Sequence, residues 1–335
     1  MPTTSDADDR SAMPEQRLSW LRRVHHGFRE WRRLAKSLLP FVRRRVYRRL
    51  EQRHDELAAV FLGGMSPAAS AAVRLVKDLD DSSQAEVCLF VSHAPQPVLK
   101  AHVVAHITQL CDAGVQVVLI VNTDLPLADI VIEPVLLARL GACVVRENLG
   151  LDFAAWAHGQ QLFSARMRPR RLMLVNDSIV GPLEDAAYRA LIQRMRACRA
   201  DVVGLTENFD PRYHLQSFFL VFNERAIQPL LQVFGRMVNM PNKDLVIDIY
   251  ETRLTQHLLS CGLRCEALFP TPARSRHAPP NDTDLRWSAL VAAGFPFVKA
   301  SVLAKLRDDP LIDKLVPVRF REVPTTAGNS ARTCR

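Results

Sequence analysis

Polar side chains gather at three places where an apolar segment gives way to a turn. They are 146–152 (RENLGLD), 176–178 (NDS) and Tyr250-Glu251, the last with 214–217 (HLQS) upstream. Carboxylate and amide oxygens are the ligands that hard cations prefer, and a carboxylate beside a hydroxyl can accept its proton. These residue types indicate a phosphorylated ligand and acid–base chemistry, if the fold brings them together.

Asp177 directly follows an apolar segment for which we expect a strand. An acid placed there can hold a divalent cation together with a diphosphate. The alternative is a turn rich in Asx and Ser side chains that has no chemistry.

The other two groups also allow two interpretations. Gly150 would let the backbone approach a ligand that Asp152 binds, or Asp152 would only cap the next helix. Glu251 is a candidate general base at the head of a helix, where the helix dipole favours its ionised form. Asp248 is the rival base, and a solvated Glu251 is the remaining alternative.

Other catalytic and metal motifs are weak in this sequence. His257, Cys261 and Cys265 are spaced for zinc, but Gly262 should end that helix and place Cys265 in the next strand. Buried structural cysteines are therefore favoured. The sequence contains no GxGxxG, GxxxxGK[ST], HExxH or GxSxG, so dinucleotide-binding, P-loop, zinc-protease and α/β-hydrolase assignments are unsupported.

Apolar segments alternate with helical ones from about residue 86. We expect strands at 86–92, 115–122, 143–146, 171–175, 201–206 and 216–222, and helices at 97–111, 153–163, 184–198 and 247–261. Strands that are apolar throughout and separated by helices are typical of a mostly parallel sheet covered on both faces. Ligands bind such sheets beyond the carboxyl ends of the strands, so the residues that follow each strand are the candidates.

The positive charge is concentrated near the N-terminus. The 335 residues carry a net charge of +9, but residues 17–53 hold 13 Lys and Arg against 2 Asp and Glu. Their helical periodicity predicts a basic amphipathic arm over 17–56, kinked at Pro40, that lies on an anionic membrane surface. The alternatives are a helix docked on the domain and a nucleic-acid-binding arm, and no nucleic-acid-binding motif supports the latter.

Composition bounds the class of protein and its compartment. With 48% hydrophobic and 24% charged residues, the chain is neither fibrous nor wholly disordered. It shows no membrane span and no signal peptide, and its 7 cysteines suit a reducing compartment. We expect a cytoplasmic protein, peripheral on the inner face of the cell membrane, with disordered ends at 1–16 and 321–335.

Six segments resemble, in consistent order, the rhamnan synthesis protein F family. They are RENLGLDFAAW (146–156), LMLVNDSIVGPL (172–183), VVGLTEN (202–208), HLQSFFLVF (214–222), YETRLTQHLLSCGL (250–263) and GFPFVK (294–299). The resemblance implies a GT-A-like, Rossmann-like nucleotide-diphospho-sugar transferase domain over 84–320, with helices on both faces of a mostly parallel sheet. It also implies an inverting glycosyltransferase that moves a sugar, such as rhamnose, from a nucleoside-diphosphate donor to a lipid-linked cell-surface polysaccharide.

The resemblance also assigns roles to residues. Asp177 stands where GT-A enzymes carry a metal-binding DXD motif, so it would hold Mg²⁺ or Mn²⁺, although its neighbours are not acidic. Glu251 stands where inverting enzymes often place the base. The donor-binding positions would be Asn148, Gly150, Asp152, Asn176, Ser178, His214, Gln216 and Lys299. The incomplete DXD motif leaves a catalytically inactive binding or scaffold subunit as the alternative.

Overall fold

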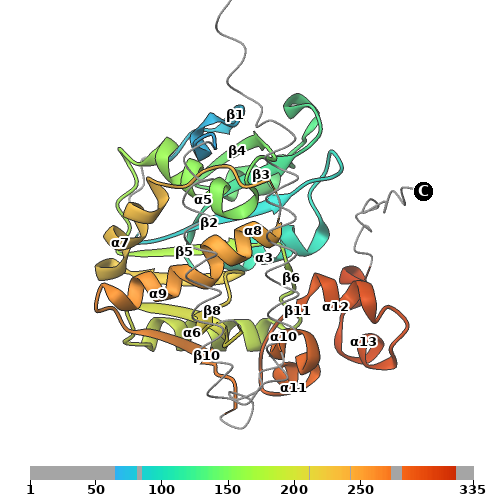
Figure 1. Cartoon of the computed structure of the whole chain (residues 1–335). Coiled ribbons are helices and arrows are strands. Elements are labelled where there is room, and N and C mark those ends of the chain that lie inside the picture. Colours follow the sequence, from blue (N-terminus) through green and yellow to red (C-terminus); the bar gives the residue numbers. More distant parts are fainter. Residues whose placement is uncertain (1–64, 81–84, 211, 242, 273–280, 322–335) are drawn as a thin grey trace, which may run out of the picture.

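The computed structural model describes residues 65–80, 85–210, 212–241, 243–272 and 281–321 (Figure 1). The predicted N-terminal segment 1–16, the basic arm 17–56 and all but the first residue of the tail 321–335 lie outside these ranges. In the described part of the chain, none of the helices is long and apolar enough to cross a bilayer.

One large sheet organises the fold. The strand order is β1 (Val73–Lys77), β4 (Ala142–Glu147), β3 (Gln116–Thr123), β2 (Glu86–His93), β5 (Arg171–Asn176), β9 (Phe219–Asn223), β7 (Val202–Asn208) and β10 (Cys265–Phe269), with β8 (His214–Leu215) paired to β7. Strands β4, β3, β2 and β5 run parallel, as do β7 and β10. Strands β1 and β9 run antiparallel to their neighbours. The predicted α/β class is confirmed, with a mixed, mostly parallel sheet.

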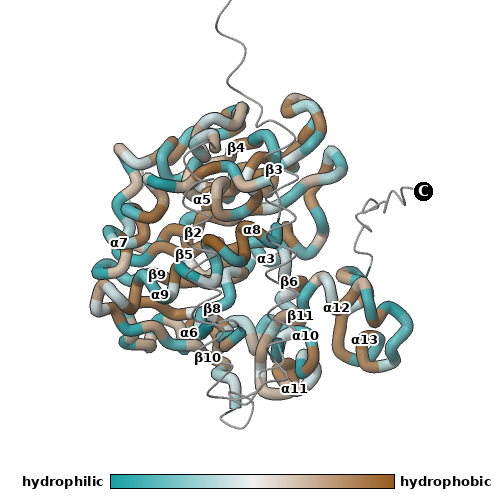
Figure 2. Tube along the Cα trace, in the orientation of Figure 1, coloured by the Kyte–Doolittle hydropathy of each residue, from teal (hydrophilic) through white to brown (hydrophobic). Residues whose placement is uncertain are grey.

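Helices cover both faces of the sheet, as Figure 1 shows. On one face lie α3 (Ala101–Asp112), α4 (Pro134–Arg139) and α6 (Asp185–Ala197). On the other lie α5 (Leu151–Phe163), α7 (Glu224–Phe234), α8 (Lys243–Val246), a π-helical turn (Ile247–Glu251) and α9 (Thr252–Ser260). Successive strand residues serve opposite cores: Leu89 packs on the α5 side and Phe90 on the α3 side. This two-sided burial is why the central strands are apolar throughout, and Figure 2 shows hydrophobic residues along them.

Residues 281–321 form a small helical lobe beside the sheet (Figure 1). It contains α10 (Asp282–Leu285), α11 (Trp287–Ala292), α12 (Ala300–Lys305) and α13 (Pro310–Leu315), packed around its own apolar cluster. Its strand β11 (Val298–Lys299) pairs antiparallel with β6 (Ile179–Val180), and the Ala300 N–H donates to the Ser178 carbonyl oxygen at 2.9 Å. This ribbon joins the two distant segments 172–183 and 294–299, and it brings Lys299 to the turn that carries Asp177.

Most predicted elements are present with shifts of a few residues. Of the strand expected over 216–222, only 219–222 is in a strand, β9; 216–218 lie between β9 and the short strand β8, which precedes the expected range. The described sheet begins with β1, ahead of residue 84, where we expected the domain to start. The residues of β1 are at most partly buried, because β1 is an edge strand. Its sequence includes Arg74 and Lys77 and therefore lacks the continuous apolar pattern of a core strand.

Candidate active site

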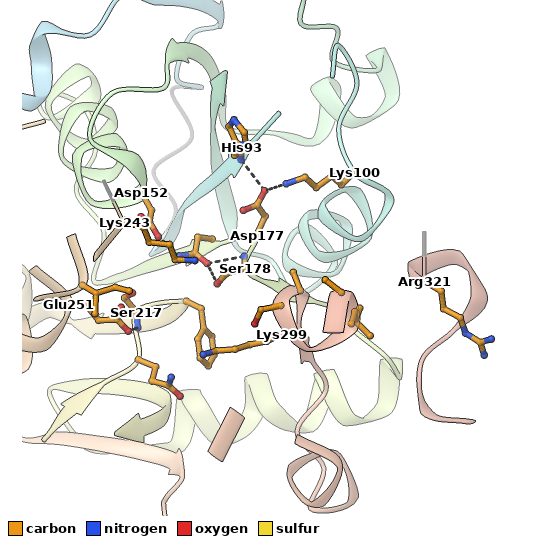
Figure 3. A pocket seen from close by; sticks show the side chains of 18 of the residues that line it. His93, Lys100, Asp152, Asp177, Ser178, Ser217, Lys243, Glu251, Lys299 and Arg321 are labelled. Atoms are coloured by element: carbon orange, nitrogen blue, oxygen red, sulfur yellow. Dashed lines mark hydrogen bonds and ion pairs between the residues drawn. The ribbon is translucent and has the colours of Figure 1, made fainter. Parts of the chain in front are cut away.

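A cavity of about 430 Å³ lies beyond the carboxyl ends of β2 and β5, within the usual size range of small-molecule sites. Its polar lining includes His93, Lys100, Asp152, Asn176, Asp177, Ser178, Gln216, Ser217, Lys243, Glu251, Lys299, Arg307 and Arg321 (Figure 3). Seven of the predicted site residues are therefore brought together, whereas Asn148, Gly150 and His214 are not among the lining residues.

Asp177 is the first residue after β5 and is held tightly by the neighbouring strand end. Its Oδ2 accepts hydrogen bonds from Ser92 Oγ at 2.9 Å, the His93 N–H at 2.9 Å and Lys100 Nζ at 2.7 Å. The side chains of Lys100 and Asp177 are only 14% and 15% exposed. Burial acts to raise the pKa of Asp177, but the charge and hydrogen bond of Lys100, with the bond from Ser92, hold that pKa below its ordinary value.

The surroundings of Asp177 do not fit a divalent cation. Asp177 Oδ2 already contacts the ammonium group of Lys100, whose positive charge would repel a cation bound to the same carboxylate. Ser178 Oγ donates to Asn176 Oδ1 at 2.5 Å, so the two neutral neighbours of Asp177 bond to one another. Among the described residues, no group of three or more His, Cys, Asp or Glu could hold a metal ion. The geometry therefore does not support the predicted Mg²⁺ or Mn²⁺ at Asp177.

Asp152 lies in the first turn of α5 and bonds across to β5. Asn176 Nδ2 donates to Asp152 Oδ2 at 2.6 Å. The N-cap of α5 is Gly150, with no side-chain cap, so Asp152 does not cap that helix. Burial raises the pKa of Asp152 to about 6, and the negative charge of Glu251 acts in the same direction.

Glu251 lies inside a continuous helical segment and not at its head, so the predicted dipole effect on Glu251 is wrong. The described segment begins at Lys243, and Glu251 ends its π-helical turn, a feature often found at functional sites. Lys243, Ile247 and Glu251 recur every four residues and line the cavity with one helix face. Asp248, the next residue around the helix after Ile247, is not among the lining residues. Glu251 Oε1 accepts the Ser217 N–H at 3.2 Å.

Cationic side chains outnumber carboxylates around the cavity: Lys100, Lys243, Lys299, Arg307 and Arg321 stand against Asp152, Asp177 and Glu251. Lys299 Nζ lies 3.7 Å from Asp284 Oδ2, too far for a hydrogen bond. Burial lowers the pKa of Lys299, while Asp284 and Glu251 oppose that shift. Arg321 lies at the outer edge of the cavity (Figure 3). Its guanidinium donates to Asp313 Oδ1 at 2.6 Å.

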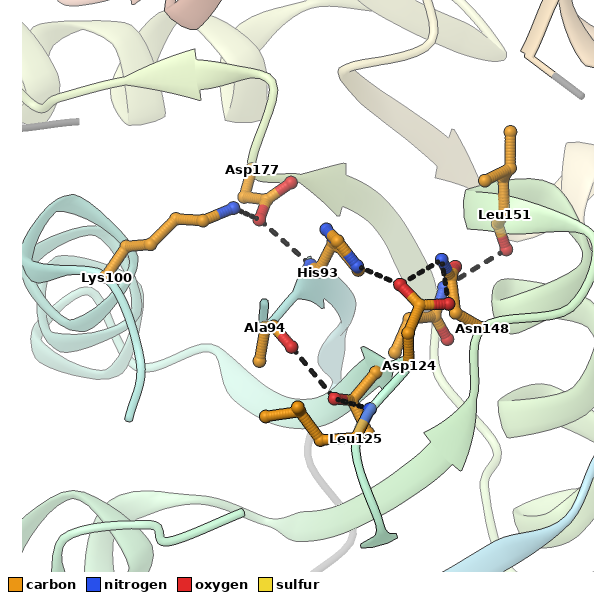
Figure 4. A network of polar contacts seen from close by, with 10 residues as sticks. His93, Ala94, Lys100, Asp124, Leu125, Asn148, Leu151 and Asp177 are labelled. Atoms are coloured by element: carbon orange, nitrogen blue, oxygen red, sulfur yellow. Dashed lines mark hydrogen bonds and ion pairs between the residues drawn. The ribbon is translucent and has the colours of Figure 1, made fainter. Parts of the chain in front are cut away.

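Three predicted donor-binding residues have other partners. A Cβ on Gly150, whose φ is +73°, would lie 2.8 Å from the Asn239 Cα, so a protein loop and not a ligand approaches this backbone. Both oxygens of Asp124 accept from Asn148 Nδ2 at 3.2 Å, and Asp124 Oδ2 also contacts His93 Nε2 at 2.9 Å (Figure 4). The buried His214 places Nδ1 2.8 Å from the Arg212 carbonyl oxygen.

Gln216 lines the cavity, but its side chain is already bonded. Its Oε1 accepts from Thr206 Oγ1 at 2.7 Å, and its Nε2 donates to Asn281 Oδ1 at 3.2 Å. The residue that follows it, Ser217, presents its N–H to Glu251, so this segment positions the candidate base.

Arg146, the first residue of the polar segment 146–152, is a positioning residue whose role the sequence did not predict. It is only 1% exposed, and its guanidinium donates to Asn122 Oδ1 at 3.0 Å, the Leu149 carbonyl at 3.0 Å and the Ala68 carbonyl at 3.4 Å. These bonds fix the loop that leads into α5 and Asp152. Burial lowers the pKa of Arg146 to about 10, so the guanidinium stays charged at neutral pH.

Sequence reasoning also missed Ser92, Lys100 and Lys243, whereas Ser217 lies in the polar segment 214–217 that it had named. Ser92 and Lys100 are separated from Asp177 by more than 70 residues, and only the pairing of β2 with β5 brings them together. Of the two, only Ser92 has a sequence signal, because it is the last residue of a predicted strand.

The zinc alternative has no support among the described residues. His257 Nε2 and Cys261 Sγ are 3.8 Å apart on α9, and no third metal ligand joins them. Gly262, with φ +73°, follows the end of α9, and Cys265 begins β10 as predicted.

The chain is an α/β protein with a polar cavity at the carboxyl ends of its parallel strands, lined by more cationic side chains than carboxylates. The sequence model of the family described as rhamnan synthesis protein F matches residues 117–316, more than half of the chain. The chain therefore belongs to the rhamnan synthesis protein F family, as predicted. The match includes Asp152, Asp177, Glu251 and Lys299.

Individual relatives are more distant. The protein named Virulence protein VirA from Vibrio anguillarum is 28% identical over 221 residues, which cover 56% of this chain and 69% of that protein. A solved CMP:2-keto-3-deoxy-manno-octonic acid synthetase complexed with CTP is 12% identical, with a TM-score of 0.33, over 57% of this chain and 91% of that chain. A TM-score this low supports no conclusion about fold or ligand.

Proposed function

We propose that the protein is an inverting glycosyltransferase that uses a nucleoside-diphosphate sugar as its donor. One observation carries the proposal: Glu251 faces a cavity at the strand ends that is otherwise rich in cationic side chains. The cationic side chains can bind the oxygens of a diphosphate, and the Glu251 carboxylate can accept the proton of a sugar hydroxyl. Membership of a family described by rhamnan synthesis supports polysaccharide as the product and rhamnose as the transferred sugar.

The cavity residues can carry out the transfer as a single displacement. The bond between the sugar C1 and the β-phosphate oxygen breaks, and the nucleoside diphosphate leaves with the electron pair through an oxocarbenium-like transition state. The acceptor hydroxyl oxygen forms the new bond to C1, and the Glu251 carboxylate takes its proton. Because the base and the leaving group lie on opposite faces of the sugar, the configuration at C1 inverts.

The other lining residues position these groups. Ser217 holds Glu251 through its N–H, and Asn176 connects Asp152 to the end of β5. The Asp177 carboxylate holds the ammonium of Lys100 near the carboxyl end of β2. None of these roles requires a metal ion.

We propose that the acceptor is a lipid-linked glycan and that the basic segment 17–53 binds the anionic inner face of the cell membrane. The support is the sequence alone, with 13 basic against 2 acidic residues in that segment, which lies outside the described residues. Each Lys or Arg near such a surface contributes about 1 kcal/mol.

The proposal is tested with the full chain and a panel of nucleoside-diphosphate sugars that includes a rhamnose donor. The correct donor at about 100 times its Kd should stabilise the folded state by about 2.7 kcal/mol, which corresponds to a Tm increase of about 5–10 °C. The protein should also release the nucleoside diphosphate from that donor. The proposal fails if no donor stabilises the protein and none is turned over.

A second candidate is a donor-binding subunit without catalysis. It is favoured by one observation, that Asp177 is occupied by Lys100 and two other donors and so forms no metal site. This candidate predicts stabilisation by the nucleotide sugar with no release of nucleoside diphosphate, even with acceptor present.

A further inference from the structure

We propose that this site binds the donor diphosphate with lysine and arginine side chains in place of a divalent cation, so that neither binding nor transfer requires metal. The inference rests on the proposed function, and it names the groups that neutralise the charge of the leaving diphosphate. Lys243 and Lys299 are the central pair, and Arg307 adds a third cation at the cavity wall.

The first argument is the position of Lys100. Its ammonium lies 2.7 Å from Asp177 Oδ2, and the same oxygen accepts Ser92 Oγ and the His93 N–H. A metal ion at Asp177 would either lie beside a mostly buried ammonium of like charge or displace it and break a hydrogen-bonded ion pair. The ion pair is therefore a structural substitute for the metal–carboxylate contact, with Lys100 as the cation.

The second argument is that the cations come from separate parts of the chain and meet only in the cavity. Lys100 is the N-cap of α3, Lys243 begins α8, and Lys299 ends β11. A charge run on one solvated helix would not converge in this way. Pairing of β11 with β6 places Lys299 beside the turn that follows β5.

The third argument is that these cations have unused capacity for an anion. The contact from Lys299 Nζ to Asp284 is 3.7 Å, beyond hydrogen-bond distance, although Lys299 is only 18% exposed. The side chains of Lys243 and Arg307 form no hydrogen bond or ion pair with the part of the chain that the structure describes. An ammonium group has three donors, so each of these lysines can bond several phosphate oxygens.

The chemistry matches what a metal would supply. Departure of a nucleoside diphosphate places negative charge on the β-phosphate oxygens, and preorganised cations in a partly enclosed cavity stabilise that charge. Burial lowers the pKa of Lys299, and the negative charge of a bound diphosphate would act to raise that pKa.

The test uses inorganic pyrophosphate and UDP or TDP as probes of the full chain, by isothermal titration calorimetry, in EDTA and then in MnCl₂. We expect binding in EDTA, with a Kd within about 3-fold of the value in Mn²⁺. Lys243→Gln and Lys299→Gln should each weaken binding at least about 10-fold, because each removes charge-assisted hydrogen bonds. Lys299→Arg should retain most of the affinity because it keeps the charge.

A matched control is available on the same lobe. Lys305 is an exposed residue that ends α12 and is not among the cavity-lining residues. Lys305→Gln removes the same charge, so it should leave the Kd within about 2-fold. If Lys299→Gln does not fold, Lys243→Gln still decides the question, because Lys243 is exposed.

The outcomes separate the inference from the proposed function. Binding that appears only with Mn²⁺ would overturn the inference and leave the proposed function standing. Wild-type affinity in both Lys243→Gln and Lys299→Gln would overturn it as well. No binding of pyrophosphate or either nucleoside diphosphate under both conditions would overturn the inference and the proposed function together.

Discussion

The ion pair between Asp177 and Lys100 should be strongly coupled, and a double-mutant cycle measures the coupling. The three variants are Asp177→Asn, Lys100→Met and their combination. Asp177→Asn leaves an ammonium that is only 14% exposed without its counter-ion, and breaking such a buried pair costs about 3–5 kcal/mol. Lys100→Met costs less, about 1–3 kcal/mol, because Asp177 keeps its bonds from Ser92 and His93. The combined variant should be more stable than the sum implies, with a coupling energy of about 2 kcal/mol.

The assay is urea unfolding at pH 7, with the free energy of unfolding compared among the four proteins. The pair Arg170–Glu224 is the control, since its side chains are 81% and 75% exposed and its atoms are 3.9 Å apart. The corresponding cycle there should give about 0.5 kcal/mol or less. If the effects of Asp177→Asn and Lys100→Met are additive, so that their coupling energy is no larger than that of the exposed pair, the account of this contact is refuted.

The pH dependence of that stabilisation has a definite sign. The pKa of Asp177 is lowered in the folded protein, so the unfolded chain takes up protons first as the pH falls. The stabilisation is fully present above the ordinary Asp pKa of about 3.9 and is lost as the pH falls through the folded value. The difference in stability between wild type and Asp177→Asn should therefore shrink at low pH.

Three further predictions concern the surroundings of the site. Gly150 and Gly262 both have φ +73°, but only a Cβ on Gly150 would meet other atoms within 4 Å; Gly150→Ala should therefore cost about 1–3 kcal/mol more unfolding free energy than Gly262→Ala. Because the pKa of Asp152 is raised to about 6, the folded protein keeps a proton that the unfolded chain loses above about pH 4. As the pH rises from 4 to 6, the free energy of unfolding of the wild type should therefore decrease relative to that of Asp152→Asn, as measured by unfolding both proteins at the two pH values. Removal of 1–53 should release the protein from anionic vesicles in a sedimentation assay, and indifference of binding to both salt and the deletion would contradict this.

The sequence predicts the elements of this fold well because the central strands are buried on both faces. In QVVLIVNT, for example, the five residues 117–121 are all apolar, and polar residues occur only at the two ends of the strand. The direction of β9 could not be predicted, because an apolar segment has the same pattern whether it runs parallel or antiparallel. The edge strand β1 was missed for the opposite reason, since its partly exposed residues lack a core pattern.

From the pattern of strands alone, the candidate site was predictable at the end of β5. Asn176 is the last residue of that strand and Asp177 directly follows it, and both line the cavity. Lys100 and Lys243 do not directly follow a predicted strand, and long-range strand and helix packing places them there. The π-helical turn that ends at Glu251 also has no sequence signal, so the residue was assigned to a helix head.

Glu251 as the proton acceptor in a cavity that binds a nucleoside-diphosphate sugar is the central claim. The most direct measurement is kcat and donor Kd for Glu251→Gln beside Asp248→Asn, which changes the neighbouring acid outside the cavity lining. We predict that Glu251→Gln keeps the donor Kd within a few-fold while kcat falls about 10²–10⁴-fold, the range expected for the loss of a general base. Asp248→Asn should keep near-normal kcat. Near-normal kcat in Glu251→Gln together with loss of kcat in Asp248→Asn would contradict the claim and assign the base to Asp248.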